Sequence, residues 1–194
     1  QDEFVELANV SSDPVDLTGW KLGDDEAVNF TFPDGYMMAP RSFLVVFGGG
    51  DVTGVDGYDA DPLVTRVFSA DSTVGNGLAN GGEIILLHSA DGSYDTWLAY
   101  GSKAATGGPP NADNYQIQID VGAAANADNS ITRFPDGNVN ILDSFVQHLT
   151  VANAAFSPNT TIDGRSAVPP PQPQVTVVIN EVLADAMGAG DANG

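Results

Sequence analysis

The chain has 194 residues, 26 Asp and Glu against 6 Lys and Arg, a formal net charge of −20 and no cysteine. Because a strongly acidic surface repels phosphate groups, this charge excludes nucleic acid as an expected partner. The lack of cysteine excludes a disulfide scaffold, thiol catalysis and thiolate-ligated zinc. The sequence has no run of about 18 apolar residues, so membrane insertion is not expected.

Short apolar runs separated by Gly, Asp, Asn and Pro predict strands along most of the chain. The expected strands, in chain order, are Phe4–Val10, Val15–Leu22, Val28–Phe32, Ser42–Phe47, Leu63–Phe68, Glu83–His88, Thr96–Tyr100 and Tyr115–Asp120. Five Asp-Gly pairs supply turn signals between such runs. Only Ile141–Leu149 has helical spacing, and its short length leaves helix or loop open. The pattern predicts an all-β protein, a β-sandwich.

The C-terminal part has a different composition. Residues 168–174 read Val-Pro-Pro-Pro-Gln-Pro-Gln, which is typical of a semi-rigid extended spacer. The following Val175–Ala184 has the β-branched composition of a strand. We therefore expect a body over 1–166, a Pro-rich linker over 167–174, and a strand with an acidic tail over 175–194.

Glycosylation-type triplets begin at Asn9, Asn29 and Asn159, and with the acidic composition they favour an extracellular or cell-surface protein. No catalytic motif is present, so an enzyme is not expected. His88 and His148 are expected to be packing or surface residues. The side chains of Asp51, Asp56, Asp59 and Asp61 form a candidate Ca²⁺ loop, with ordinary turn chemistry as the alternative.

Several stretches together resemble the lamin tail domain family, an immunoglobulin-like β-sandwich found in nuclear lamins and in secreted bacterial and archaeal proteins. They are Glu3–Asn9, Val15–Leu22, Phe43–Val46, Leu78–Leu87 with Asp91-Gly92, and Ser130–Gly137. The resemblance covers most of residues 1–165. It implies an immunoglobulin-like fold and a non-catalytic module.

One departure from the family pattern concerns its first strand. The family carries a motif like Ile-Asn-Glu-Val before the Glu-Phe-Val-Glu-Leu strand, whereas here Ile179–Val182 lies at the C-terminal end. The resemblance therefore implies a donor strand that docks on an acceptor edge. The donor residues are Val177, Val178, Ile179, Asn180, Glu181, Val182 and Leu183, and the edge residues are Phe4, Val5, Glu6 and Leu7.

Three arrangements satisfy this order of motifs: donation to a neighbouring copy, self-closure, or a chain cut from a tandem array. The stiff spacer favours donation, which predicts a homopolymeric extracellular filament assembled head-to-tail. The alternative is a monomeric secreted or cell-surface module that binds calcium, a glycan or a surface. If the strand docks in the family order, Asp191 and Asn193 come beside Asp2 and Glu3, a second candidate Ca²⁺ site. An ordinary solvated acidic loop is the other interpretation of these four residues.

Overall fold

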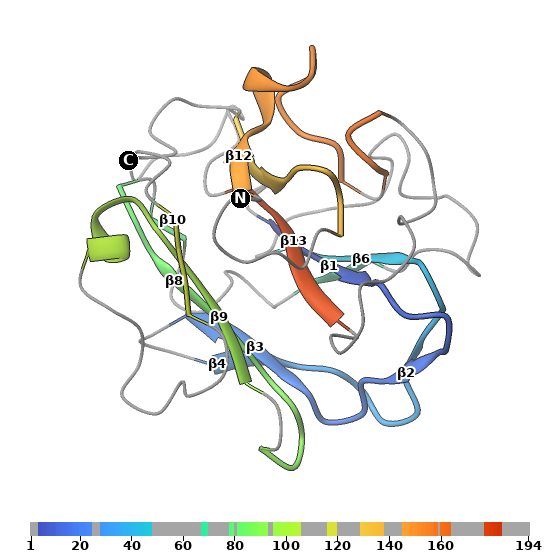
Figure 1. The fold of residues 1–194 in the computed structure, drawn as a ribbon. Helices are drawn as coiled ribbons and strands as arrows, with labels where there is room; N and C mark the ends of the chain where they lie inside the picture. Colours follow the sequence, from blue (N-terminus) through green and yellow to red (C-terminus); the bar gives the residue numbers. More distant parts are fainter. Residues whose placement is uncertain are drawn as a thin grey trace.

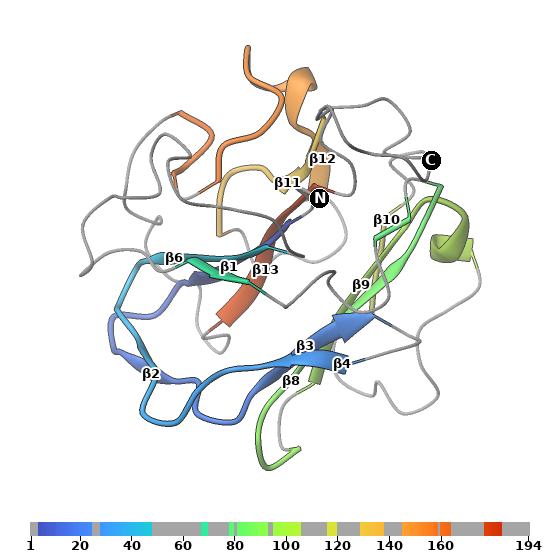
Figure 2. The same cartoon turned by 180° about the vertical axis from the view of Figure 1, so that it is seen from behind.

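The computed structural model of the chain describes residues 4–24, 28–47, 67–69, 78–79, 81–92, 95–105, 116–119, 129–137, 145–158, 160–163 and 177–183. These residues form strands and two short 3-10 helices, η1 (Gly101–Ala105) and η2 (His148–Thr150). Two larger sheets pack face to face, as Figures 1 and 2 show from opposite sides. The prediction of an all-β, immunoglobulin-like β-sandwich is confirmed.

The first sheet has the strand order β12-β11-β13-β1-β6-β7. Its members are β12 (Phe145–Gln147), β11 (Ile131–Arg133), β13 (Val177–Leu183), β1 (Phe4–Asn9), β6 (Phe43–Phe47) and β7 (Val67–Ser69). Neighbouring strands are antiparallel except β6 and β7, which run parallel. The strand that comes last in the sequence therefore lies in the interior of this sheet.

The second sheet has the order β10-β9-β8-β3-β4. It contains β10 (Gln116–Ile119), β9 (Asp95–Tyr100), β8 (Ile84–His88), β3 (Lys21–Asp24) and β4 (Val28–Thr31). A small third sheet pairs β2 (Val15–Asp16) with β5 (Met37–Met38). Both β6 and β8 are continuous apolar runs, which suits strands buried on both faces.

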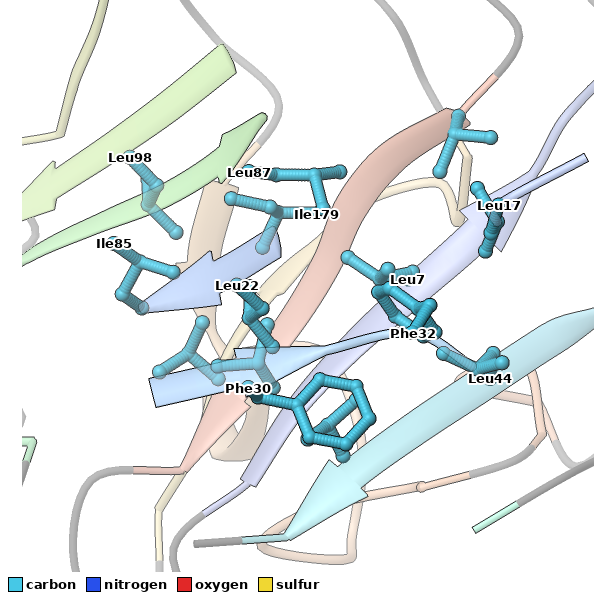
Figure 3. Close-up of a cluster of buried hydrophobic side chains, with 14 of the residues drawn as sticks. Leu7, Leu17, Leu22, Phe30, Phe32, Leu44, Ile85, Leu87, Leu98 and Ile179 are labelled. Atoms are coloured by element: carbon cyan, nitrogen blue, oxygen red, sulfur yellow. The ribbon is translucent and has the colours of Figure 1, made fainter. Parts of the chain in front are cut away.

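The main core lies between the two large sheets. Alternate residues of β1, β6 and β8 point toward it, because successive side chains of a strand face opposite sides. In Figure 3, the labelled side chains of this core come from both layers. Those from the first sheet are Leu7, Leu44 and Ile179, and those from the second are Leu22, Phe30, Ile85, Leu87 and Leu98.

Several predicted elements differ from the structure. The expected strand Val15–Leu22 is split into β2 and β3, because Leu17–Trp20 forms a turn in which Trp20 N donates to Leu17 O and Gly19 has φ +71°. The described end of Ile141–Leu149 is the strand β12 followed by η2, so a helix over this segment is wrong there. The strands β5 and β11 were not expected from the sequence.

Gly82 ends the turn that leads into β8, and its conformation requires glycine. Its φ is +143°, and an added Cβ would collide with Ser102 N and lie 2.7 Å from Tyr100 O. We expect Gly82→Ala to lower the free energy of unfolding by at least about 2 kcal/mol, measured by urea denaturation. Gly81→Ala is the matched control, since a Cβ there has open space around it. Equal stability of the two variants would contradict the prediction.

Candidate functional site

The strand β13 is paired along both of its edges. Its antiparallel pairing with β1 runs from Phe4 opposite Leu183 to Asn9 opposite Val177. On the other edge, Ile131 of β11 lies opposite Val182. In Figure 1 β13 crosses the sheet beside β1, and Figure 2 shows the same arrangement from behind. Without β13, β1 and β11 would have no common neighbour in this sheet.

All seven residues of β13 are buried. The side chains of Val177, Ile179 and Val182 belong to the main core. On the opposite face, Val178 packs in a small cluster with Ala8, and Leu183 packs in another with Phe4. At about 1.5–3 kcal/mol for each of five apolar side chains, burial of β13 contributes about 8–15 kcal/mol gross.

A bulge between Glu6 and Leu7 changes the register of β1 against β13, so that the pairing passes from Glu181 directly to Ile179. The extra residue at this point is Asn180. Its Nδ2 donates to Glu6 Oε1 at 2.8 Å, and its Oδ1 accepts from Gly137 N at 2.9 Å. A bulge redirects side chains locally, which places polar groups of β13 beside each other.

Around this bulge lies a buried polar cluster, which we define as Glu6, Ser130, Arg133, Asp136, His148, Ser157, Asn180 and Glu181. Glu181 Oε1 accepts from Ser130 Oγ and, at 3.0 Å, from Ser157 N. Ser157 Oγ lies 3.1 Å from Glu181 Oε2. Asp136 Oδ2 accepts from Ile162 N at 2.9 Å. The cluster therefore joins β13 to β1 and to the segments before and after β11 and β12.

Arg133 is the cation of this cluster and is itself buried. Its Nε donates to Ile179 O at 2.7 Å, and its guanidinium carbon lies 4.4 Å from the centre of the Phe145 ring. A guanidinium is weakly hydrated and stacks on aromatic rings, so it is tolerated in such a site. Arg133 thus connects β11, β12 and the backbone of β13.

Burial changes the protonation of three groups in the cluster. It raises the pKa of Glu181 to about 7, against the opposing effect of the hydrogen bonds from Ser130 and Ser157. Burial also raises the pKa of Asp136, and it lowers the pKa of His148. Desolvation is the common cause, since each shift favours the uncharged form.

The hydrogen bonds of the polar cluster hold β13 in its sheet. His148 is fully buried and its Nδ1 lies 2.7 Å from Ala154 O, so no carboxylate orients the ring as in a hydrolytic triad. Among the described residues, no group of three or more His, Cys, Asp or Glu is placed to hold a metal ion. No helix in the described part of the chain is long and apolar enough to cross a bilayer.

The structure brings together the predicted donor residues Val177–Leu183 and the predicted edge Phe4–Leu7. Both belong to the same chain, so this single-chain structure shows self-closure. The stiff spacer favours the other arrangement, in which the strand points away from its own body toward a neighbouring copy. Intramolecular docking avoids the translational and rotational entropy lost on association.

Asn9, a predicted glycosylation acceptor, lies inside the folded chain. Asn9 is fully buried, its Nδ2 donates to Ala39 O at 2.9 Å and to Asp13 O at 3.0 Å, and its Oδ1 accepts from Ser11 N. Asn9 instead ties the end of β1 to the loop before β6.

The side chains of the remaining predicted site residues lie outside the described part of the structure. Asn29 lies in β4, and its side chain lies outside the described part of the structure. The other glycosylation candidate and both candidate Ca²⁺ sites lie outside the described residues, namely Asn159, Asp2, Glu3, Asp51, Asp56, Asp59, Asp61, Asp191 and Asn193.

Sequence reasoning did not find the polar cluster, although it singled out two of its segments. Ser130–Gly137 and Ile179–Val182 both belong to the stretches that resemble the family, and they supply Ser130, Arg133, Asp136, Asn180 and Glu181. A polar pair inside an otherwise apolar strand, Asn180-Glu181, was the available signal, because buried polar groups need partners.

One comparison with known proteins, the scan against family models, agrees with this fold. The family model described as Lamin Tail Domain matches residues 1–102, which include β1 to β9 and most of the second sheet. Searches of curated proteins and of solved structures found no match. Domains of this family are immunoglobulin-like and in general non-catalytic. From the match over more than half of its length, the chain belongs to the lamin tail domain family.

Proposed function

We propose that the chain is a non-catalytic structural subunit of an extracellular filament, assembled head-to-tail when the C-terminal strand of one copy completes the sandwich of the next. The observation that carries the proposal is the place of β13. It is the last described strand in the sequence, yet it lies inside its sheet with strands on both edges. A body that receives such a strand from the far end of a chain can receive it from a second copy.

The contacts of β13 are the same in both arrangements. Its ladder with β1, its apolar contacts and its polar cluster depend on the strand itself, so exchange between copies loses none of them. Residues 164–176 separate the strand from the preceding described segment. At about 3.1 Å per residue in an extended Pro-rich form, 13 residues reach about 40 Å, enough to span to a neighbour.

Self-closure in the single chain favours the second candidate function, a monomeric extracellular lamin tail module. Fold-back benefits from an effective concentration in the millimolar range for a short linker. Exchange must overcome this advantage through linker stiffness or a high local concentration of subunits. The two candidates therefore differ in one measurable property, the chain to which the strand paired with β1 belongs.

A designed disulfide tests the proposal directly. Ala8 lies opposite Val178 in the antiparallel pairing, and both side chains belong to one small apolar cluster on the same face. Opposite residues in such a pair have Cα atoms about 4.5–5.5 Å apart, within the range of a disulfide. Because the natural chain has no cysteine, Ala8→Cys/Val178→Cys contains only this pair.

Oxidation of this double variant at high protein concentration is expected to give a ladder of covalent multimers on a non-reducing gel. Ala8→Cys/Ile179→Cys is the matched control, since Ile179 points into the main core and should not cross-link to position 8. A cross-linked monomer at every concentration tested would refute strand donation and establish the monomeric module. Electron microscopy of the reduced and oxidised samples shows whether multimers are fibres.

Calcium binding, glycosylation at Asn29 or Asn159, and extracellular location accompany this proposal as predictions from the sequence. For calcium, a melting temperature that falls on addition of chelator would support bound metal. A melting temperature unchanged by chelator and by added Ca²⁺ would contradict it.

A further inference from the structure

Three side chains of the polar cluster lie in a row, joined by hydrogen-bond contacts. These contacts need one more proton than a neutral histidine, a serine and an ionised glutamate supply. His148 Nδ1 lies 2.7 Å from Ala154 O, and its Nε2 lies 2.9 Å from Ser157 Oγ. The same Ser157 Oγ lies 3.1 Å from Glu181 Oε2. His148 and Glu181 are both fully buried. One hydroxyl thus stands between an imidazole and a carboxyl group.

The number of available hydrogens limits the protonation states that these three side chains can adopt. A backbone carbonyl only accepts, so His148 Nδ1 must carry a hydrogen, and in a neutral ring Nε2 is then an acceptor. Ser157 has a single hydroxyl hydrogen, which can serve either Nε2 or Glu181 Oε2 but not both. With a neutral ring and an ionised carboxylate, one of the two contacts therefore lacks a hydrogen.

One added proton satisfies both contacts, in either of two ways. A protonated Glu181 can donate to Ser157, which donates to His148; or an imidazolium can donate to Ser157, which donates to a carboxylate. The first form leaves all three relay side chains uncharged, whereas the second leaves two of them as desolvated ions. The uncharged form is therefore favoured, in agreement with the raised pKa of Glu181 and the lowered pKa of His148.

We propose that His148, Ser157 and Glu181 form a relay that holds one proton on Glu181, and that β13 is docked most firmly while this proton is present. The inference concerns β13 wherever it docks, in its own chain or in a second copy, so it does not depend on filament formation. It goes beyond the proposed function by assigning a pH-sensitive lock to the strand.

Other charged groups surround the relay on every packed element. Glu6 of β1 lies opposite Glu181 in register, and it accepts from Asn180. Arg133 of β11 donates to Ile179 O. Asp136 follows β11, and its charge adds to the rise in the pKa of Glu181. The acids oppose loss of the relay proton and Arg133 favours it.

The pH dependence follows from comparing folded and unfolded chains. The unfolded chain loses its His148 proton near 6.5 and its Glu181 proton near 4.5. The folded relay keeps its one proton up to about 7. Between pH 4.5 and 6.5 each state holds about one proton. Between the unfolded His148 pKa of 6.5 and the folded Glu181 pKa of about 7, the folded chain binds more protons, so stability falls as pH rises. The folding equilibrium is expected to decrease about threefold between pH 6 and pH 8 from this source, and then to level off.

The decisive measurement is a titration of the isotope-labelled full chain by nuclear magnetic resonance. The Glu181 carboxyl carbon is expected to titrate near pH 7, and His148 Nε2 is expected to shift at the same pH while its ring stays neutral. This shift arises because the Ser157 hydrogen turns from Nε2 to the carboxylate. An ionised Glu181 at pH 6 would overturn the proposal, whether His148 is then neutral or an imidazolium.

Two variants separate the relay from ordinary burial. Ser157→Ala removes the bridging hydroxyl, so the Glu181 and His148 steps are expected to lose their common midpoint, and a retained common midpoint would contradict the relay. Glu181→Gln keeps a neutral donor at this position and removes the carboxyl that titrates. The threefold fall is then expected to be replaced by a rise from pH 6 to pH 8, because only the unfolded chain still binds the His148 proton near pH 6. Asp34→Asn, at an exposed turn, is the control and should leave both steps unchanged. The titration of the natural chain decides the matter even if either variant fails to fold.

Discussion

A chain that ends at residue 174 is expected to lose cooperative folding altogether. Removing β13 withdraws five buried apolar side chains, worth about 8–15 kcal/mol gross, whereas a typical domain has a net stability of about 5–15 kcal/mol. It also leaves β1 and β11 without their common neighbour. The expected result is a broad, non-cooperative thermal transition and strong binding of a hydrophobic dye.

Addition of a peptide of residues 175–194 to the truncated chain is expected to restore a cooperative transition whose midpoint rises with peptide concentration. The control peptide carries Ile179→Asp and Val182→Asp, which place charges in the main core and should prevent docking. A truncated chain with the melting temperature of the full chain would contradict the central place of β13. Rescue would show that the body accepts the strand from a separate molecule, as the proposed filament needs.

Arg133→Ala is expected to lower the free energy of unfolding by about 3–5 kcal/mol, the range for removing one partner from a buried charge network. The substitution leaves Ile179 O without the hydrogen bond from Arg133 Nε and opens a cavity beside Phe145. It also removes the cation from a cluster that holds the buried acids Glu6, Asp136 and Glu181. Urea denaturation at pH 7 measures the loss.

Arg133→Met is the matched comparison, because methionine keeps much of the apolar contact but not the charge or the donor. We expect it to recover only the packing part of the loss. A further comparison at pH 5 tests the electrostatic part, since protonation of Glu181, whose pKa burial raises to about 7, reduces the uncompensated charge. An Arg133→Ala variant within about 0.5 kcal/mol of the natural chain would contradict the role given to this residue.

The parts of the fold that the sequence predicts well are those with a local signal. The run Phe43–Phe47 is apolar at every position and bounded by turn residues, and it forms β6 as expected. The run Ile84–His88 forms β8 for the same reason. Where both faces of a strand are buried, composition alone is sufficient to identify it.

Elements that depend on distant partners were not predictable in this way. The strand β11 has only three residues. One of them is the buried Arg133, and a charged residue predicts an exposed position from sequence alone. Its place follows from pairing with β13, almost 50 residues further on. The polar cluster is harder still, because Glu6 and Asn180 are 174 positions apart and meet only in the folded chain.

The place of β13 also has a consequence for the order of events during synthesis. Every other strand of its sheet leaves the ribosome before β13 does, so the sheet cannot close while the body is being made. Contacts between β1 and β13 have very high contact order, which slows folding and leaves apolar surface exposed meanwhile. A net charge of −20 keeps such open chains apart by mutual repulsion.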